Sequence, residues 1–148
     1  PRKFINGSDS SIAGLELEIQ KEFGDNLNIR IAGTHIFDEF SKINSESSNL
    51  FTTSLSYSTA NWSANISANY QGEKFTEAVS GASDIKHGGY TIFNTNFVYQ
   101  ATQSWEFFGK VRNLFDKSYN SPASRSANTQ GVQNRGRTAE AGFRWYFK

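Results

Sequence analysis

Apolar and polar residues alternate along seven stretches of this 148-residue chain. Residues 62–71 show the pattern most clearly, with Trp62 and Ile66 at positions of one parity and Ser63 and Ser67 at positions of the other. A strand projects successive side chains to opposite faces, whereas a helix would mix the two sets. The pattern therefore predicts strands that each have one apolar and one polar face.

The gaps between these stretches alternate in length. The predicted strands cover residues 12–23, 27–37, 50–58, 62–71, 90–100, 105–112 and 138–147. The short gaps are residues 24–26, 59–61 and 101–104, and the long ones run over about 41–49, 73–89 and 116–135. This alternation predicts an all-β, antiparallel transmembrane barrel segment, with tight turns at one rim and long loops at the other.

Aromatic residues on the apolar parity gather near both predicted rims. Near the turns they are Tyr57, Trp62, Tyr99, Trp105, Trp145 and Phe147. Near the long loops they are Phe37, Phe51, Tyr70 and Phe115. Aromatic rings concentrate at lipid–water interfaces, so the apolar face is predicted to contact lipid.

The polar parity carries charges of both signs, which are Glu16, Glu18, Arg30, Glu106, Lys110, Arg112, Glu140 and Arg144. Such a set suits a wide aqueous lumen in which opposite charges on neighbouring strands pair.

Two alternative folds stay open at this point. A soluble calycin-like binding protein would turn the apolar face inward. An autonomous outer-membrane barrel of about eight strands, with an adhesin or structural role, would need a further strand from residues 1–11.

Composition and spacing give no indication of an enzyme or of nucleic-acid binding. The net charge is +1, and no Lys/Arg cluster is interleaved with aromatic residues. His35 falls on the apolar parity and His87 in a predicted loop, without the spacing of a metal site, so both are interpreted as surface histidines. No nucleophile motif is present, and no catalytic residue, cofactor or metal ligand is predicted.

The C-terminal residues resemble a known family. The sequence FGKVRNLFDKSY, from Phe108 to Tyr119, precedes Asn-Arg-Gly-Arg and a closing strand AEAGFRWYF. This arrangement is similar to the end of TonB-dependent outer-membrane receptors. The residues that match the family motif are Val111, Asn113, Leu114, Phe115, Asp116, Lys117, Tyr119, Gly136, Arg137 and Phe147. The chain departs from the family at Lys148, because members usually end on the aromatic residue.

The resemblance implies a fold and a function for the whole protein. Such receptors form a barrel of about 22 strands around an N-terminal plug. They import scarce ligands, such as ferric siderophores, haem or cobalamin, across the outer membrane of Gram-negative bacteria. Residues 1–148 would then be the C-terminal part of that barrel, without the plug. The implied partners are outer-membrane lipid, the rest of the barrel and plug, the TonB energy-transducing complex and a small-molecule ligand.

Physical roles follow for several motif residues. Asn113 and Asp116 are expected to cap free backbone groups in the turn that leaves the strand. Gly136 is expected to allow a bend or a close backbone approach. For Arg137, a pair with Asp116 is preferred to a lipid phosphate. The imported ligand is not predicted, and Tyr90, Tyr119 and Asn120 are candidate contacts only by their position near the loop rim.

Overall fold

A computed structural model describes residues 13–37, 47–76, 85–121 and 131–147, and these residues form strands, turns and irregular segments. Seven long strands make one sheet, and their bounds match the predicted stretches to within two residues at every end. They are β1 (Gly14–Phe23), β2 (Leu27–Ile36), β3 (Asn49–Ser58), β4 (Trp62–Gln71), β7 (Tyr90–Gln100), β8 (Trp105–Arg112) and β11 (Thr138–Trp145). Among the described residues no helix is long and apolar enough to cross a bilayer.

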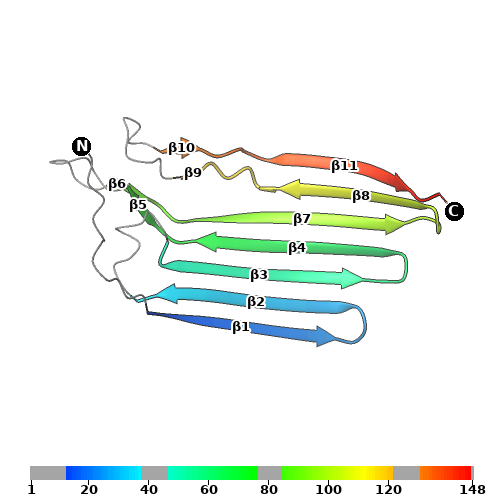
Figure 1. The fold of residues 1–148 in the computed structure, drawn as a ribbon, viewed down its shortest axis with the longest axis horizontal. Helices are drawn as coiled ribbons and strands as arrows, with labels where there is room; N and C mark the ends of the chain where they lie inside the picture. Colours follow the sequence, from blue (N-terminus) through cyan, green and yellow to red (C-terminus); the bar gives the residue numbers. More distant parts are fainter. Residues whose placement is uncertain (1–12, 38–46, 77–84, 122–130, 148) are drawn as a thin grey trace, which may run out of the picture.

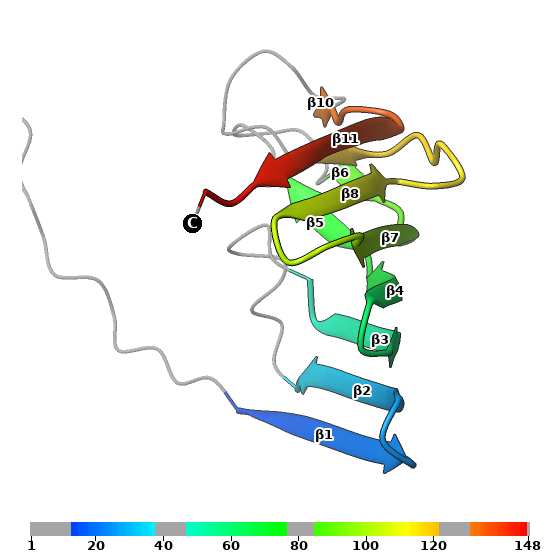
Figure 2. The same ribbon diagram turned by 90° about the vertical axis from the view of Figure 1, so that its right-hand side faces the viewer.

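The strands follow one another across the sheet in the order β1-β2-β3-β4-β7-β8-β11, and every neighbouring pair is antiparallel. Figure 1 shows the three short turns at one end of the sheet and the long connections at the other, as the sequence predicted. The end-on view of Figure 2 shows that β1 and β11 lie at opposite edges of an open sheet. The described residues are therefore a segment of a barrel wall. The possible strand in residues 1–11 lies outside the described residues.

Two of the long connections contain short strand pairs that the sequence analysis missed. In the connection after β4, β5 (Lys74–Thr76) pairs with β6 (Ile85–His87). In the connection after β8, β9 (Asn120–Ser121) pairs with β10 (Val132–Gln133). The prediction of plain loops there was wrong, because runs of two or three residues are too short to show a period of two.

The register places the two parities on opposite faces of the sheet throughout. On the apolar face, Leu55 lies between Ile29 and Ile66 on its neighbouring strands. On the polar face, Ser67 lies between Ser54 and Asn94. No apolar side chain among the described residues is buried, and Leu15 is 61% exposed while Phe143 is also 61% exposed. The sheet thus has no core of its own, and its apolar face needs an apolar medium to cover it.

Aromatic rings cluster on the apolar face at the turn end. Trp105 and Trp145 face each other across β8 and β11 and stack with centroids 5.2 Å apart. Phe147 packs on Trp145 at 4.3 Å, and Trp62 packs on Tyr57 at 5.2 Å. At the other end, Phe93 and Phe115 make an edge-to-face contact. These two clusters lie at the two rims near which the sequence analysis predicted aromatic residues.

Candidate functional site

The turn that ends β8 is built around Asn113. This residue is only 4% exposed and adopts a left-handed backbone conformation, with φ of 52°. Its side-chain amide donates to the carbonyl of Lys117 at 2.9 Å, while its Oδ1 accepts from the amide of Lys117 at 2.8 Å. Its backbone amide donates to Oδ1 of Asn94 on β7 at 3.1 Å. Asn113 therefore closes the turn and fastens it to the neighbouring strand.

Asp116 joins this turn to the start of β11. It also has a left-handed backbone, with φ of 53°, and its Oδ1 accepts from the backbone amide of Arg137 at 2.6 Å. The guanidinium of Arg137 donates instead to the carbonyl of Leu114 at 3.4 Å. The expected pair between the charged side chains of Arg137 and Asp116 was therefore wrong, because Asp116 binds the main chain of Arg137 and the guanidinium binds Leu114. A Cβ at Gly136 would lie 2.5 Å from Oδ1 of Asp116, so the absence of a side chain there permits this approach.

The other motif residues have separate positions. Leu114 donates its amide to the carbonyl of Phe93 at 2.7 Å, which fixes the turn against β7. Phe115, at 68% exposure, and Phe147, at 79%, belong to the two aromatic clusters of the apolar face. Tyr119 lies at the loop end, with its ring 4.1 Å from that of Tyr90. The motif therefore binds β7, β8 and β11 together at the loop rim.

Opposite charges pair on the polar face at both sides of the sheet. Arg30 on β2 makes two hydrogen bonds with Glu18 on β1, at 2.8 and 2.9 Å. Arg144 on β11 pairs with Glu106, its direct neighbour on β8, and lies 4.8 Å from the ring centre of Phe108. Between these pairs, β3 and β4 present uncharged serine, threonine and asparagine side chains. The sequence predicted pairing across strands, and these two contacts are of that kind.

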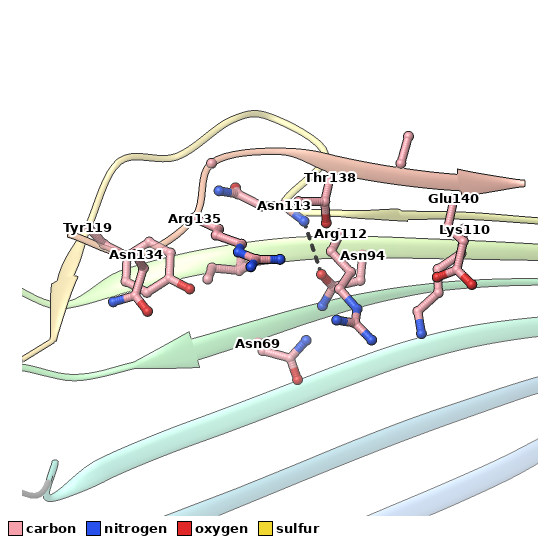
Figure 3. A pocket seen from close by; sticks show the side chains of 13 residues that line it. Asn69, Asn94, Lys110, Arg112, Asn113, Tyr119, Asn134, Arg135, Thr138 and Glu140 are labelled. Atoms are coloured by element: carbon pink, nitrogen blue, oxygen red, sulfur yellow. Dashed lines mark hydrogen bonds between the residues drawn. The ribbon is translucent and has the colours of Figure 1, made fainter. Parts of the chain in front are cut away.

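A recess of about 670 Å³ lies on the polar face at the loop end, over β7, β8 and β11 (Figure 3). Three cationic residues line it, which are Lys110 and Arg112 on β8 and Arg135 in the segment that leads to β11. Among the described lining residues the one carboxylate is that of Glu140, opposite Lys110 in the ladder. Within the described part of the chain, none of these three cations forms an ion pair. The recess is therefore cationic, unlike the two ion pairs described above.

A second recess of about 680 Å³ adjoins it between residues 85–90, which include β6, and residues 117–120. The three residues singled out by position in the sequence, Tyr90, Tyr119 and Asn120, all line this recess. His87 also lines it, at the end of β6 and 9% exposed, so the prediction of a loop-borne surface histidine was wrong. Tyr119 lines both recesses and separates them.

Solved structures share this architecture. The pyoverdine outer-membrane receptor FpvA of Pseudomonas aeruginosa superposes with a TM-score of 0.76 at 21% identity, over 92% of this chain and 21% of that one. A variant of the ferric enterobactin receptor PfeA of the same organism gives 0.74 at 18% identity, over 92% and 22%. The copper transporter OprC gives 0.69 at 20% identity, over 92% and 23%. No protein-family model matches the chain.

The chain has the barrel fold of the TonB-dependent receptors. It spans between 21% and 23% of the length of these three proteins, so it corresponds to part of one barrel wall. At these identities the likeness establishes the fold. What FpvA, PfeA or OprC binds is a property of those proteins.

The sequence analysis missed two features of the polar face. Phe108 has the parity of the lumen charges, and its ring covers Gly142 on β11, where an added Cβ would lie 2.6 Å from the ring. Once the register is known, a glycine directly opposite an aromatic residue on the neighbouring strand indicates that the ring packs over the glycine. The second feature is Arg135, which joins Lys110 and Arg112 only because the chain after β10 returns to the sheet.

Proposed function

We propose that residues 1–148 are the C-terminal part of the barrel of an outer-membrane receptor that imports a scarce small-molecule ligand with energy from the TonB complex. The observation that carries this proposal is the two-faced open sheet. One face exposes aliphatic side chains between two aromatic clusters, and the other carries polar and charged groups. A lipid-facing exterior and an aqueous lumen account for both faces.

The edges of the sheet support a larger barrel. Within the described residues β1 and β11 each have one neighbour, and an unpaired edge in lipid leaves backbone groups without hydrogen bonds. Strands from the rest of the receptor are proposed to pair with both edges. The plug would then face the polar side, and outer-membrane lipid the apolar side. The outer membrane of a Gram-negative bacterium is the proposed location.

The ligand class is also a proposal. FpvA was solved with pyoverdine, PfeA is a ferric enterobactin receptor and OprC is a copper transporter. Two of these three proteins are siderophore receptors, which supports a ferric siderophore as the cargo that we propose for the whole receptor, and the family resemblance adds haem and cobalamin as members of the same class of scarce ligand. No catalytic role is proposed.

The experiment uses the full-length protein that contains this segment, in its own host. Cells with and without the gene are grown under limitation of iron, haem or cobalamin, and the accumulated metal is measured by mass spectrometry. We expect one form of accumulation to fall in the deletion strain, and to be restored by the gene only when TonB is intact. Restoration without TonB, or unchanged accumulation under every limitation, would contradict the proposal.

A further inference from the structure

We propose that the cationic recess formed by Lys110, Arg112 and Arg135 is a binding site for an anionic group of a small molecule, such as a carboxylate or a phosphate. The inference rests on the proposed function, because this face lines a lumen only in the closed barrel. It specifies one property of the ligand, which is negative charge at the position that meets β8 and β11.

The distribution of charge over the polar face supports an anion at this position. Arg30 and Arg144 are each neutralised by a carboxylate on the neighbouring strand. In contrast, Lys110, Arg112 and Arg135 share a recess with one carboxylate, that of Glu140, among the described lining residues. Unpaired cations in a concave site raise the local concentration of anions, because the walls focus the field. The three cations without an ion-pair partner among the described residues thus lie where this face is also hollowed.

The remaining walls supply hydrogen bonds and an aromatic surface. The side chains of Asn69, Asn134 and Tyr119 line the same recess and are labelled in Figure 3. Amide and phenol groups orient a polar ligand, and guanidinium groups bind carboxylate and phosphate in a two-pronged geometry. The volume of about 670 Å³ is in the range of pockets that hold small molecules.

The turn described above holds the cations in place. Arg112 immediately precedes Asn113, which is fixed by its bonds to Lys117 and Asn94. Arg135 immediately precedes Gly136, whose close approach to Asp116 brings that segment over the sheet. The family motif therefore positions two of the three cations, in addition to joining β7, β8 and β11 at the loop rim.

The register offers a matched pair of probes. Thr138 on β11 lies directly opposite Arg112, which forms no ion pair with the described residues. Ser54 on β3 lies directly opposite Arg30, which is paired with Glu18. This chain contains no cysteine, so Thr138→Cys and Ser54→Cys each place a single thiol in this segment beside one arginine.

The experiment measures the reaction rates of these thiols with an anionic and a cationic methanethiosulfonate reagent, in the full-length protein in outer-membrane vesicles, on a cysteine-free background. We expect the anionic-to-cationic rate ratio at position 138 to exceed that at position 54 by about tenfold. The combined variant Arg112→Gln and Arg135→Gln should abolish this difference. Citrate or inorganic phosphate at millimolar concentration should slow the reaction at position 138 and leave position 54 unaffected.

Three results would contradict the proposal. Equal ratios at the two positions would show that the recess carries no unneutralised positive charge, and the proposal would be wrong. A thiol at position 138 that resists both reagents would show that protein covers the recess, which also contradicts a small-molecule site. A raised anionic-to-cationic rate ratio at position 138 that citrate and phosphate do not lower would mean that the recess is positively charged but binds no anion, which would contradict the proposal. None of these outcomes depends on import, so failure here and failure of the proposed function are distinguishable.

Discussion

Oδ1 of Asp116 accepts a hydrogen bond from the backbone amide of Arg137 at 2.6 Å, across 21 residues of chain. This bond ties the turn after β8 to the start of β11. Within the described residues β11 has β8 as its one strand neighbour, so the contact fixes where the last strand begins. It also explains a glycine at position 136, since a Cβ there would displace the carboxylate.

Replacement of Asp116 by alanine should destabilise the barrel. The variant loses the bond to Arg137, worth about 1 kcal/mol, and a non-glycine residue without a short polar side chain strains the left-handed backbone by about 1 kcal/mol more. The measurement is urea unfolding of the full-length protein in detergent. Asp116→Asn is the control, because asparagine keeps an acceptor and tolerates this backbone. Equal losses in both variants would contradict the assigned role.

Asn113 should show a graded response. Asn113→Gly keeps the left-handed backbone but loses the two side-chain bonds to Lys117, so we expect a loss of about 2 kcal/mol. Asn113→Ala adds backbone strain of about 1 kcal/mol and should be the less stable of the two. The midpoints of urea unfolding give the order. A glycine variant as stable as the parent protein would mean that the bonds to Lys117 contribute nothing.

The long strands were predictable because each of their side chains faces one of two media, lipid or water, and its polarity matches that medium. In β4, Trp62 and Ser63 differ in the medium they meet, so ten residues of alternation identify the strand and its faces. The short hairpins had no such signal. His87 was misplaced for that reason, since β6 has only three residues.

The candidate site was predictable only in part. Lys110 and Arg112 were placed on the polar face by parity, but parity alone does not bring Arg135 to them. That approach depends on the path of a connection of more than twenty residues and on the contact of Gly136 with Asp116. Opposite charges on neighbouring strands were expected to pair, whereas the identity of the Glu106–Arg144 pair and the contact of Arg144 with Phe108 required the register of β8 against β11.

The packing of Phe108 over Gly142 makes a further prediction. Gly142→Ala introduces a Cβ 2.6 Å from the ring, so the ring must move, and we expect a loss of about 1 to 2 kcal/mol of stability. In a double-mutant cycle with Phe108→Ala, the two losses should be less than additive by about 1 kcal/mol. Gly109→Ala is the control, because no atom lies within 4 Å of its added Cβ. Additive losses would show that the two positions do not interact.

The two faces of β4 give the most direct test of the membrane assignment. Ile66 is 41% exposed on the apolar face, between Leu55 and Thr95, whereas the next residue, Ser67, lies on the polar face between Ser54 and Asn94. Ile66→Arg places a charge in lipid near the middle of the strand and should cost about 2 to 4 kcal/mol. Ser67→Arg meets an aqueous lumen and should be nearly neutral. Urea unfolding of the full-length protein in lipid vesicles measures both variants at adjacent positions with the same new side chain. Equal effects would mean that the two faces meet the same medium, and a larger effect at Ser67 would mean that the polar face is the one that meets lipid, which would contradict the assignment of the faces.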